Sequence, residues 1–252
     1  MDQQEHSYRA LAMVGQLHQW ASHPRGGDDV VALGMVTRGD FKRMYTGQLA
    51  RSGSHARPFY DRIKMSAPNN ICPYCGFGAV ETLDHFLAKG RYCSLAVLPM
   101  NLVPACSDCN RKKHDGVETA EGISSHPYFE ESCVAVDEWL YASLIHSARP
   151  AATFHVMPPD TWDRAVAQRV TNHFDRFELA GRYATQASER LMVYAAVVHE
   201  LVSAGAQDEV ATHLQRGART ELRIGRNSWQ AALAKAIAND IWFHTEGYRR
   251  LI

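Results

Sequence analysis

Four cysteines arranged in two Cys-x-x-Cys pairs are the strongest chemical signal in the sequence: Cys72, Cys75, Cys106 and Cys109. Each pair can place two thiolates on one side of a tight loop. Two pairs together supply the four soft ligands that a tetrahedral zinc ion prefers. Because four protein ligands leave no open position on the ion, the spacing predicts a structural zinc site that joins the ends of a longer loop.

Polar residues that could hydrolyse a phosphodiester lie inside this loop or directly after it. An imidazole with an ordinary pKa of about 6.5 can take a proton from water at neutral pH, which suits His85 as a general base. The Asp84 carboxylate and the Asn110 amide oxygen are hard donors of the kind that bind Mg²⁺ or Mn²⁺. In a helix, His114 would share a face with Asn110 and could add a nitrogen ligand. The alternative for His114 is a capping or solvated side chain.

The stretch resembles the HNH endonuclease family in three separated segments, CPYCG, LDHFLAK and LPMNLVPACSDCNRKK. The resemblance implies a ββα-metal fold, in which two strands and a helix enclose the active site. It also implies that His85 is the general base, that Asp84 binds the catalytic metal, and that Asn101 pins the loop and orients the base. Ala88 stands before Lys89 where the family usually has proline, a departure that concerns the shape of the loop and no catalytic position.

Several basic residues could contact backbone phosphates, a type of contact that gives affinity without sequence preference. Those nearest the motif are Lys89, Arg91, Arg111, Lys112 and Lys113. A solvated helix face is the alternative for the last three. Lys42, Arg43, Arg62 and Lys64 could also touch phosphate, but a solvated face is the simpler interpretation for these four.

The composition is that of a folded protein without a global charge. With 252 residues, of which 46% are hydrophobic, the chain can build one sizeable core or two small ones. Its net charge of zero offers no overall basic field, so nucleic acid must be held by a local patch or by a partner. The sequence shows neither a signal peptide nor a membrane span, which predicts a cytoplasmic protein. Cysteines there favour metal ligation over disulfides, so Cys93 and Cys133 are interpreted as free thiols.

The first half of the chain is expected to mix helices and short strands. Apolar spacing predicts a helix over residues 5–22, and residues 34–49 are typical of a turn followed by a short helix. Residues 79–87 have the content of a strand that ends at the Asp-His pair. Residues 90–100 form a crossing loop with part of a second strand as an option, and a short helix, NRKKHD, then ends at Gly116.

The second half is expected to be mainly helical. Residues 132–157 predict two strands, or one strand and a loose connection. Four helices follow, over residues 160–177 with Asp160 or Thr161 as the cap, 184–205, 209–224, and from Asn227 or Ser228 through Ile241. The fold class is therefore α+β and mostly helical. It has three expected parts: an N-terminal mostly helical region (1–70), an HNH core (71–116), and connecting strands with a C-terminal helical bundle (117–252).

The resemblance implies a metal-dependent HNH endonuclease that hydrolyses DNA phosphodiester bonds, with double-stranded DNA as the expected substrate. Structural zinc and catalytic Mg²⁺ or Mn²⁺ are the expected cofactors. The resemblance further implies a role in bacterial anti-phage defence or restriction.

Two alternatives stay open. One is a catalytically silent, zinc-stapled nucleic-acid-binding or adaptor subunit. The other is a nuclease that cuts only when a partner, for instance an ATPase, delivers it to DNA, and the neutral charge favours this version over a free-standing nuclease. The choice between DNA and RNA, and the oligomeric state, are not fixed by the sequence.

Overall fold

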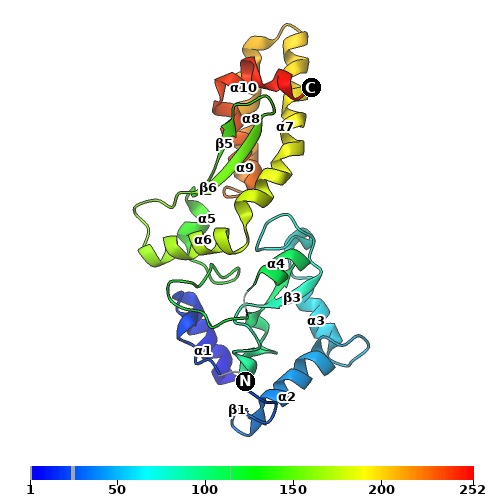
Figure 1. Ribbon diagram of the computed structural model, residues 1–252, viewed down its shortest axis with the longest axis vertical. Helices are drawn as coiled ribbons and strands as arrows, with labels where there is room; N and C mark the ends of the chain where they lie inside the picture. The colour runs from blue at the N-terminus through cyan, green and yellow to red at the C-terminus, as the bar shows by residue number, and fades with distance from the viewer. Residues whose placement is uncertain (1, 24–25, 114) are drawn as a thin grey trace. The chain divides into compact units, whose positions relative to one another are not determined.

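The computed structural model describes residues 2–23, 26–113 and 115–252 (Figure 1). The fold is α+β and mostly helical, which confirms the predicted class. The described strands form three two-stranded antiparallel sheets. The chain divides into two compact units, Met1–Glu131 and Ser132–Ile252, and each is considered by itself below. None of the helices described here has both the length and the apolar character needed to cross a membrane.

The first unit begins with α1 (Asp2–Met13), which is shorter than the predicted helix over 5–22. Gly15 has a φ of 67°, a left-handed conformation that favours glycine and ends the helix, and the chain continues into the 3₁₀ turn η1 (Leu17–Gln19). Val14 is 56% exposed, so the predicted apolar face does not extend through it.

A hairpin of β1 (Val31–Leu33) and β2 (Val36–Thr37) leads into α2 (Arg38–Arg43). This agrees with the turn and the short helix that were predicted for residues 34–49. Thr37 and Asp40 form a reciprocal capping box at the start of α2. The helix runs on into a π-helical segment, η2 (Met44–Leu49), and α3 (Arg57–Lys64) follows.

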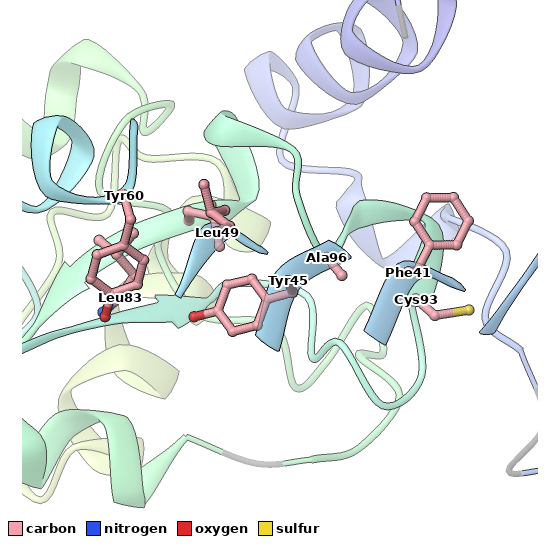
Figure 2. Packing of buried hydrophobic residues seen from close by; sticks show 8 residues of the cluster. Phe41, Tyr45, Leu49, Tyr60, Leu83, Cys93 and Ala96 are labelled. Atoms are coloured by element: carbon pink, nitrogen blue, oxygen red, sulfur yellow. The ribbon is translucent and has the colours of Figure 1, made fainter. Parts of the chain in front are cut away.

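A hydrophobic cluster joins these helices to the motif region. Phe41, Tyr45, Leu49 and Tyr60 are buried together with Leu83, Cys93, Ala96 and Leu102 (Figure 2). Leu83 lies on the strand that carries the Asp-His pair. The N-terminal helices therefore form one wall of the core on which that strand is placed.

The centre of the first unit is a pair of antiparallel strands followed by a helix: β3 (Thr82–His85), β4 (Leu102–Ala105) and α4 (Ser107–Lys112). Asp84 pairs with Val103, and His85 pairs with Leu102. The prediction that the first strand ends at the Asp-His pair is confirmed. The second strand, however, follows residues 90–100 instead of starting within them.

The segment before β4 consists of short turns. They are η4 (Cys93–Leu95) and η5 (Pro99–Asn101), and η3 (Pro68–Asn70) precedes the first cysteine pair. The helix α4 starts earlier than predicted because Cys106 is its N-cap, and it ends at Lys112, before Gly116.

The second unit is built from a hairpin and the helices around it. Its elements in chain order are α5 (Ser132–Val136), β5 (Leu140–Ile145), β6 (Ala151–Val156), α6 (Arg164–Arg176), α7 (Leu179–Ser203), η6 (Gln207–Glu209), α8 (Val210–Ile224), α9 (Trp229–Asn239), α10 (Ile241–Thr245) and η7 (Gly247–Arg250). The two strands pair in regular antiparallel register. Of the two alternatives predicted for residues 132–157, the structure therefore shows two strands and not one strand with a loose connection. Helix α7 packs on β6 and α9 packs on β5.

Two details of the predicted helices were wrong. Asp163 caps α6, in place of Asp160 or Thr161, by accepting a hydrogen bond from the Ala165 amide. Asp240 ends α9 and caps α10, so Ile241 starts a new helix and is 76% exposed.

Candidate active site

The four predicted cysteine ligands come together in one buried cluster. Their sulfur atoms all lie within 4.8 Å of one another, and the Sγ atoms of Cys75 and Cys106 are 3.9 Å apart. A tetrahedral ion with metal–sulfur bonds of about 2.3 Å separates its sulfurs by roughly 3.8 Å, so the cluster has the size that such an ion requires. The four thiols therefore form a structural metal site.

The loop geometry around this metal site depends on close approach of the backbone. A Cβ atom at Gly78 would lie 2.9 Å from Sγ of Cys106, so a side chain there would displace a ligand. The Gly78 amide instead donates to Cys75 Sγ at 3.3 Å, and the Cys109 amide donates to Cys106 Sγ at 3.5 Å. Hydrogen bonds from Cys109, and next from Cys72, hold the pKa of the Cys75 thiol far below its usual range, which favours the thiolate that a metal binds.

Asp84 is buried on β3, with 5% of its surface exposed. The hydroxyl of Tyr74, from the first cysteine loop, donates to Asp84 Oδ2 at 2.8 Å. Burial, and then the charge of Asp84, raise the pKa of Tyr74 well above its usual range, so the phenol keeps the proton that it donates. The cysteine loop thus fixes the orientation of the carboxylate that is the predicted metal ligand.

His85 is also buried and is held in one tautomer. Its Nε2 lies 2.9 Å from the carbonyl oxygen of Ala96, and because a carbonyl can only accept, Nε2 must carry the proton. Nδ1 is then the basic nitrogen, and it has no hydrogen-bond partner among the residues that the structure describes. The ring of Tyr45 packs edge-on at 4.4 Å between centroids. Burial lowers the pKa of His85 to about 4, so the imidazole is neutral at neutral pH.

Asn101 is completely buried and makes four hydrogen bonds with its side chain. Its Oδ1 accepts from the Leu87 amide at 2.7 Å and from the Tyr8 hydroxyl at 3.1 Å. Its Nδ2 donates to the carbonyls of Leu87 at 3.0 Å and Leu95 at 3.3 Å. Asn101, which directly precedes β4, therefore holds Leu87 and Leu95, two points of the loop after His85.

A buried histidine outside the motif supports Asn101 through Tyr8. The Tyr128 amide donates to Nδ1 of His126 at 3.1 Å, so the ring proton of His126 is on Nε2, which lies 3.1 Å from the Tyr8 hydroxyl. The ring of His126 packs on Phe86, with centroids 4.1 Å apart. The order of donors is thus His126 to Tyr8 to Asn101.

The second predicted metal ligand, Asn110, is exposed on α4, and this helix contacts β3 (Figure 1). In the described part of the chain, the four cysteines are the group of His, Cys, Asp or Glu donors close enough to share an ion, and Asp84 belongs to no such group. The role of Asn110 as a second ligand of a hard cation at Asp84 stays a prediction. The predicted shared face of Asn110 and His114 depended on a longer helix, and His114 lies outside the described residues.

Residues 72–116 match the family model for HNH endonucleases. This segment is an HNH domain. Its two strands, its helix and the Asp-His pair are features that the resemblance implied, and the cysteine cluster is the one that the spacing of the two cysteine pairs predicted.

The similarity to another protein extends beyond the HNH domain. Protein ea31 of Escherichia phage lambda is 31% identical over 193 residues. The aligned part covers 75% of this chain and 64% of that protein, so it spans less than two thirds of the relative's length. No solved structure matches the chain significantly.

The five basic residues predicted to hold phosphate around the HNH domain lie in different surroundings. Lys89 is exposed, with Nζ 4.6 Å from the centre of the Tyr45 ring. Arg111 is exposed and pairs with Asp108 one turn earlier on α4. Arg91 and Lys112 are half-buried.

Lys113 differs most from the expectation. Its side chain is 3% exposed and forms an ion pair of 3.0 Å with the equally buried Glu118, and its Nζ lies 4.9 Å from the centre of the Phe86 ring. An ammonium group held in this way anchors the end of α4 to the segment after the HNH domain. A phosphate contact would require this buried pair to open.

Four aromatic or imidazole side chains that position the HNH residues were not among the predicted site residues: Tyr8, Tyr45, Tyr74 and His126. Tyr74 lies between the two cysteines of the first pair, so its place beside the site could have been inferred. Tyr8 and His126 are 93 and 25 positions from Asn101, and nothing in their local sequence links them to it.

Proposed function

We propose that the protein is a metal-dependent HNH endonuclease that hydrolyses DNA phosphodiester bonds. The observation that carries the proposal is the state of His85 inside the matched segment. Burial keeps the ring neutral, and the bond from Nε2 to the Ala96 carbonyl leaves Nδ1 as the proton acceptor. A general base must be unprotonated and held in a fixed direction, and this arrangement supplies both conditions.

In the proposed reaction His85 Nδ1 takes a proton from the attacking water. The Ala96 carbonyl stabilises the imidazolium that forms, because it faces the Nε2–H bond. Asn101 and the Tyr45 ring keep the loop and the imidazole in place. The water oxygen bonds to phosphorus as the bond to the 3′-oxygen breaks, and the 3′-oxygen takes a proton from solvent, so the products carry 5′-phosphate and 3′-hydroxyl ends.

Two ions with separate tasks belong to the proposal. Zinc is the proposed ion of the four-cysteine cluster, since four thiolates suit a tetrahedral soft-ligand site. Asp84 and Asn110 are the proposed protein ligands of Mg²⁺ or Mn²⁺, which when bound would stabilise charge on the phosphate and the leaving oxygen. Residues 1–70 and 117–252 are proposed as the parts that flank the nuclease core.

Delivery to double-stranded DNA by a protein partner, such as an ATPase, is a further part of the proposal. It is supported by the zero net charge, which gives no long-range attraction to DNA. The cytoplasmic location, oligomeric state and defence role stay predictions, because neither the site nor the match to Protein ea31 bears on them.

The test is cleavage of supercoiled plasmid by zinc-loaded full-length protein, with Mg²⁺ or Mn²⁺ added or left out. Omission is preferable to a chelator, which would also strip the structural site. His85→Gln is the informative variant, because its amide nitrogen can still donate to Ala96 while no base remains. A control substitution at the exposed His55 should cut like the wild type.

Metal-dependent nicking that His85→Gln reduces by about 10²- to 10⁴-fold would support the proposal. Equal cleavage by His85→Gln would refute His85 as the base. A folded, zinc-loaded protein that cuts neither plasmid, single strands nor RNA, alone or with a partner ATPase, would favour the silent adaptor.

A further inference from the structure

A pocket of about 310 Å³ lies in the first unit, with walls from both the HNH domain and the N-terminal helices. Arg38, Lys42 and Thr46 come from the α2–η2 helix, and Lys89 and Gly90 come from the loop after His85. This volume is at the lower end of the range for small-ligand sites. Three cationic side chains and one carboxylate, Asp28, line it.

Two residues that line the pocket also contact the candidate base, His85. Tyr45 lines the pocket and packs against the His85 ring at 4.4 Å. Ala96 also lines it, and its carbonyl accepts the bond from His85 Nε2 at 2.9 Å. Figure 2 shows both residues in the cluster that joins η2 to the loop. A group bound in the pocket would therefore be separated from the His85 imidazole by Tyr45 or Ala96 alone.

Lys42 is the cation of the pocket that is held loosely enough to take an anionic ligand. Lys42 Nζ is 3.6 Å from Asp28 Oδ2, and these side chains are 67% and 62% exposed, so water screens the pair. Arg38 Nη2 donates to the Gly90 carbonyl at 3.2 Å, which directs the guanidinium toward the loop. Lys89 interacts electrostatically with both Asp84 and Asp115.

We propose that this pocket binds a backbone phosphate of the nucleic acid next to the phosphate that is cleaved. The ligand class follows from the three cationic side chains that stand in an otherwise mostly apolar lining, and from the contacts of Tyr45 and Ala96 with His85. The proposal rests on the proposed nuclease function, because it assigns the pocket to the same substrate. The proposal gives helix α2 a direct part in substrate binding, although α2 lies outside the matched HNH segment.

The experiment measures binding of a short fluorescein-labelled DNA duplex over a series of salt concentrations. Full-length, zinc-loaded His85→Gln protein is used so that no cleavage occurs. Lys42→Gln and Arg38→Gln are added to this background. Arg43→Gln is the matched control, because Arg43 is on the same helix, is 70% exposed, and pairs with Asp40 outside the pocket.

We expect each pocket variant to bind about ten-fold more weakly, the effect of losing one charge-assisted contact. The slope of log K against log salt should fall by about 1 for each lost phosphate contact. Arg43→Gln should change neither value. The proposal would be overturned if Arg43→Gln weakened binding as much as the pocket variants do. It would also be overturned if the His85→Gln protein with an unaltered pocket bound no duplex.

Binding and cleavage can fail separately. A duplex that binds through Lys42 and Arg38 but is cut neither by the wild-type protein alone nor with a partner ATPase would leave the pocket assigned and would refute the nuclease function. Cleavage that continues with unchanged KM in both pocket variants would refute the pocket and leave the nuclease in place.

Discussion

Replacing His126 by asparagine should flatten the acid dependence of the stability of the first unit. Burial, and then the charge of Lys113, lower the pKa of His126 to about 3. An unfolded histidine has a pKa of about 6.5, so between these values the unfolded chain binds more protons than the folded one. The stability that neutral His126 contributes is therefore complete above about pH 6.5 and is lost as the pH falls toward about 3.

The size of the effect follows from the difference between the two pKa values. Each pH unit in this window costs about 1.4 kcal/mol, so a fall from about pH 6.5 to about pH 5 removes roughly 2 kcal/mol of unfolding free energy. The charged and titratable groups that face the ring are Lys113, which is paired with Glu118, and the phenols of Tyr8 and Tyr128. Asparagine keeps an acceptor for the Tyr128 amide and does not titrate.

The assay is urea unfolding of the zinc-saturated chain, monitored by hydrogen exchange of peptides from β3 and β4. These peptides report the unfolding free energy of the first unit alone. The stability gap between wild type and His126→Asn should shrink by about 2 kcal/mol between about pH 7 and about pH 5. Effects of zinc and of other histidines are common to both proteins and cancel. The exposed His55 provides the control substitution. A gap that stays constant with pH would refute the reasoning.

Three further predictions concern the groups that hold the site together. Cys75→Ser, or removal of the ion by a chelator, should expose the amides of β3 and β4 to hydrogen exchange, because structural zinc contributes folding free energy. Zinc content and hydrogen exchange are measured on the same samples, and unchanged protection of these amides would contradict a structural role. Tyr8→Phe should destabilise the first unit by about 1–2 kcal/mol by removing the donor to Asn101, as measured by urea unfolding, and a change near zero would show that the bond is dispensable. Lys113→Met should cost about 3–5 kcal/mol by removing the ion-pair partner of the buried Glu118 carboxylate, and adding Glu118→Gln should recover part of the loss; additive losses would argue against coupling.

Local signals in the sequence predicted what depends on neighbouring residues. Short stretches of sequence are enough to specify the cysteine pairs, the strand ending at His85 and the long helices of the second unit. Their boundaries were less predictable, because a cap is decided by which of several nearby side chains reaches a free amide. Asp163 instead of Asp160 starts α6, and Asp240 splits an apolar pattern that continues to Ile241.

The candidate site needed contacts that no local pattern contains. Lys113 belongs to a run of basic residues that is typical of a solvated face, but Glu118 pairs with it and buries it. His126 and Tyr8 are 118 positions apart and meet only after the chain has folded around Asn101. Long-range partners of this kind leave no periodicity, so the sequence could name the reactive groups but not their supports.

The hydrogen bonds around Asn101 mean that the nuclease motif is not a self-sufficient module. A fragment cut at the ends of the matched segment would retain every motif residue, yet it would lack Tyr8 and His126, which lie on either side of it. Transplanting the motif into another scaffold would meet the same difficulty, since the recipient would have to provide a buried phenol and imidazole at matching positions. A substitution at any one of these three residues should accordingly weaken the support that the other two receive.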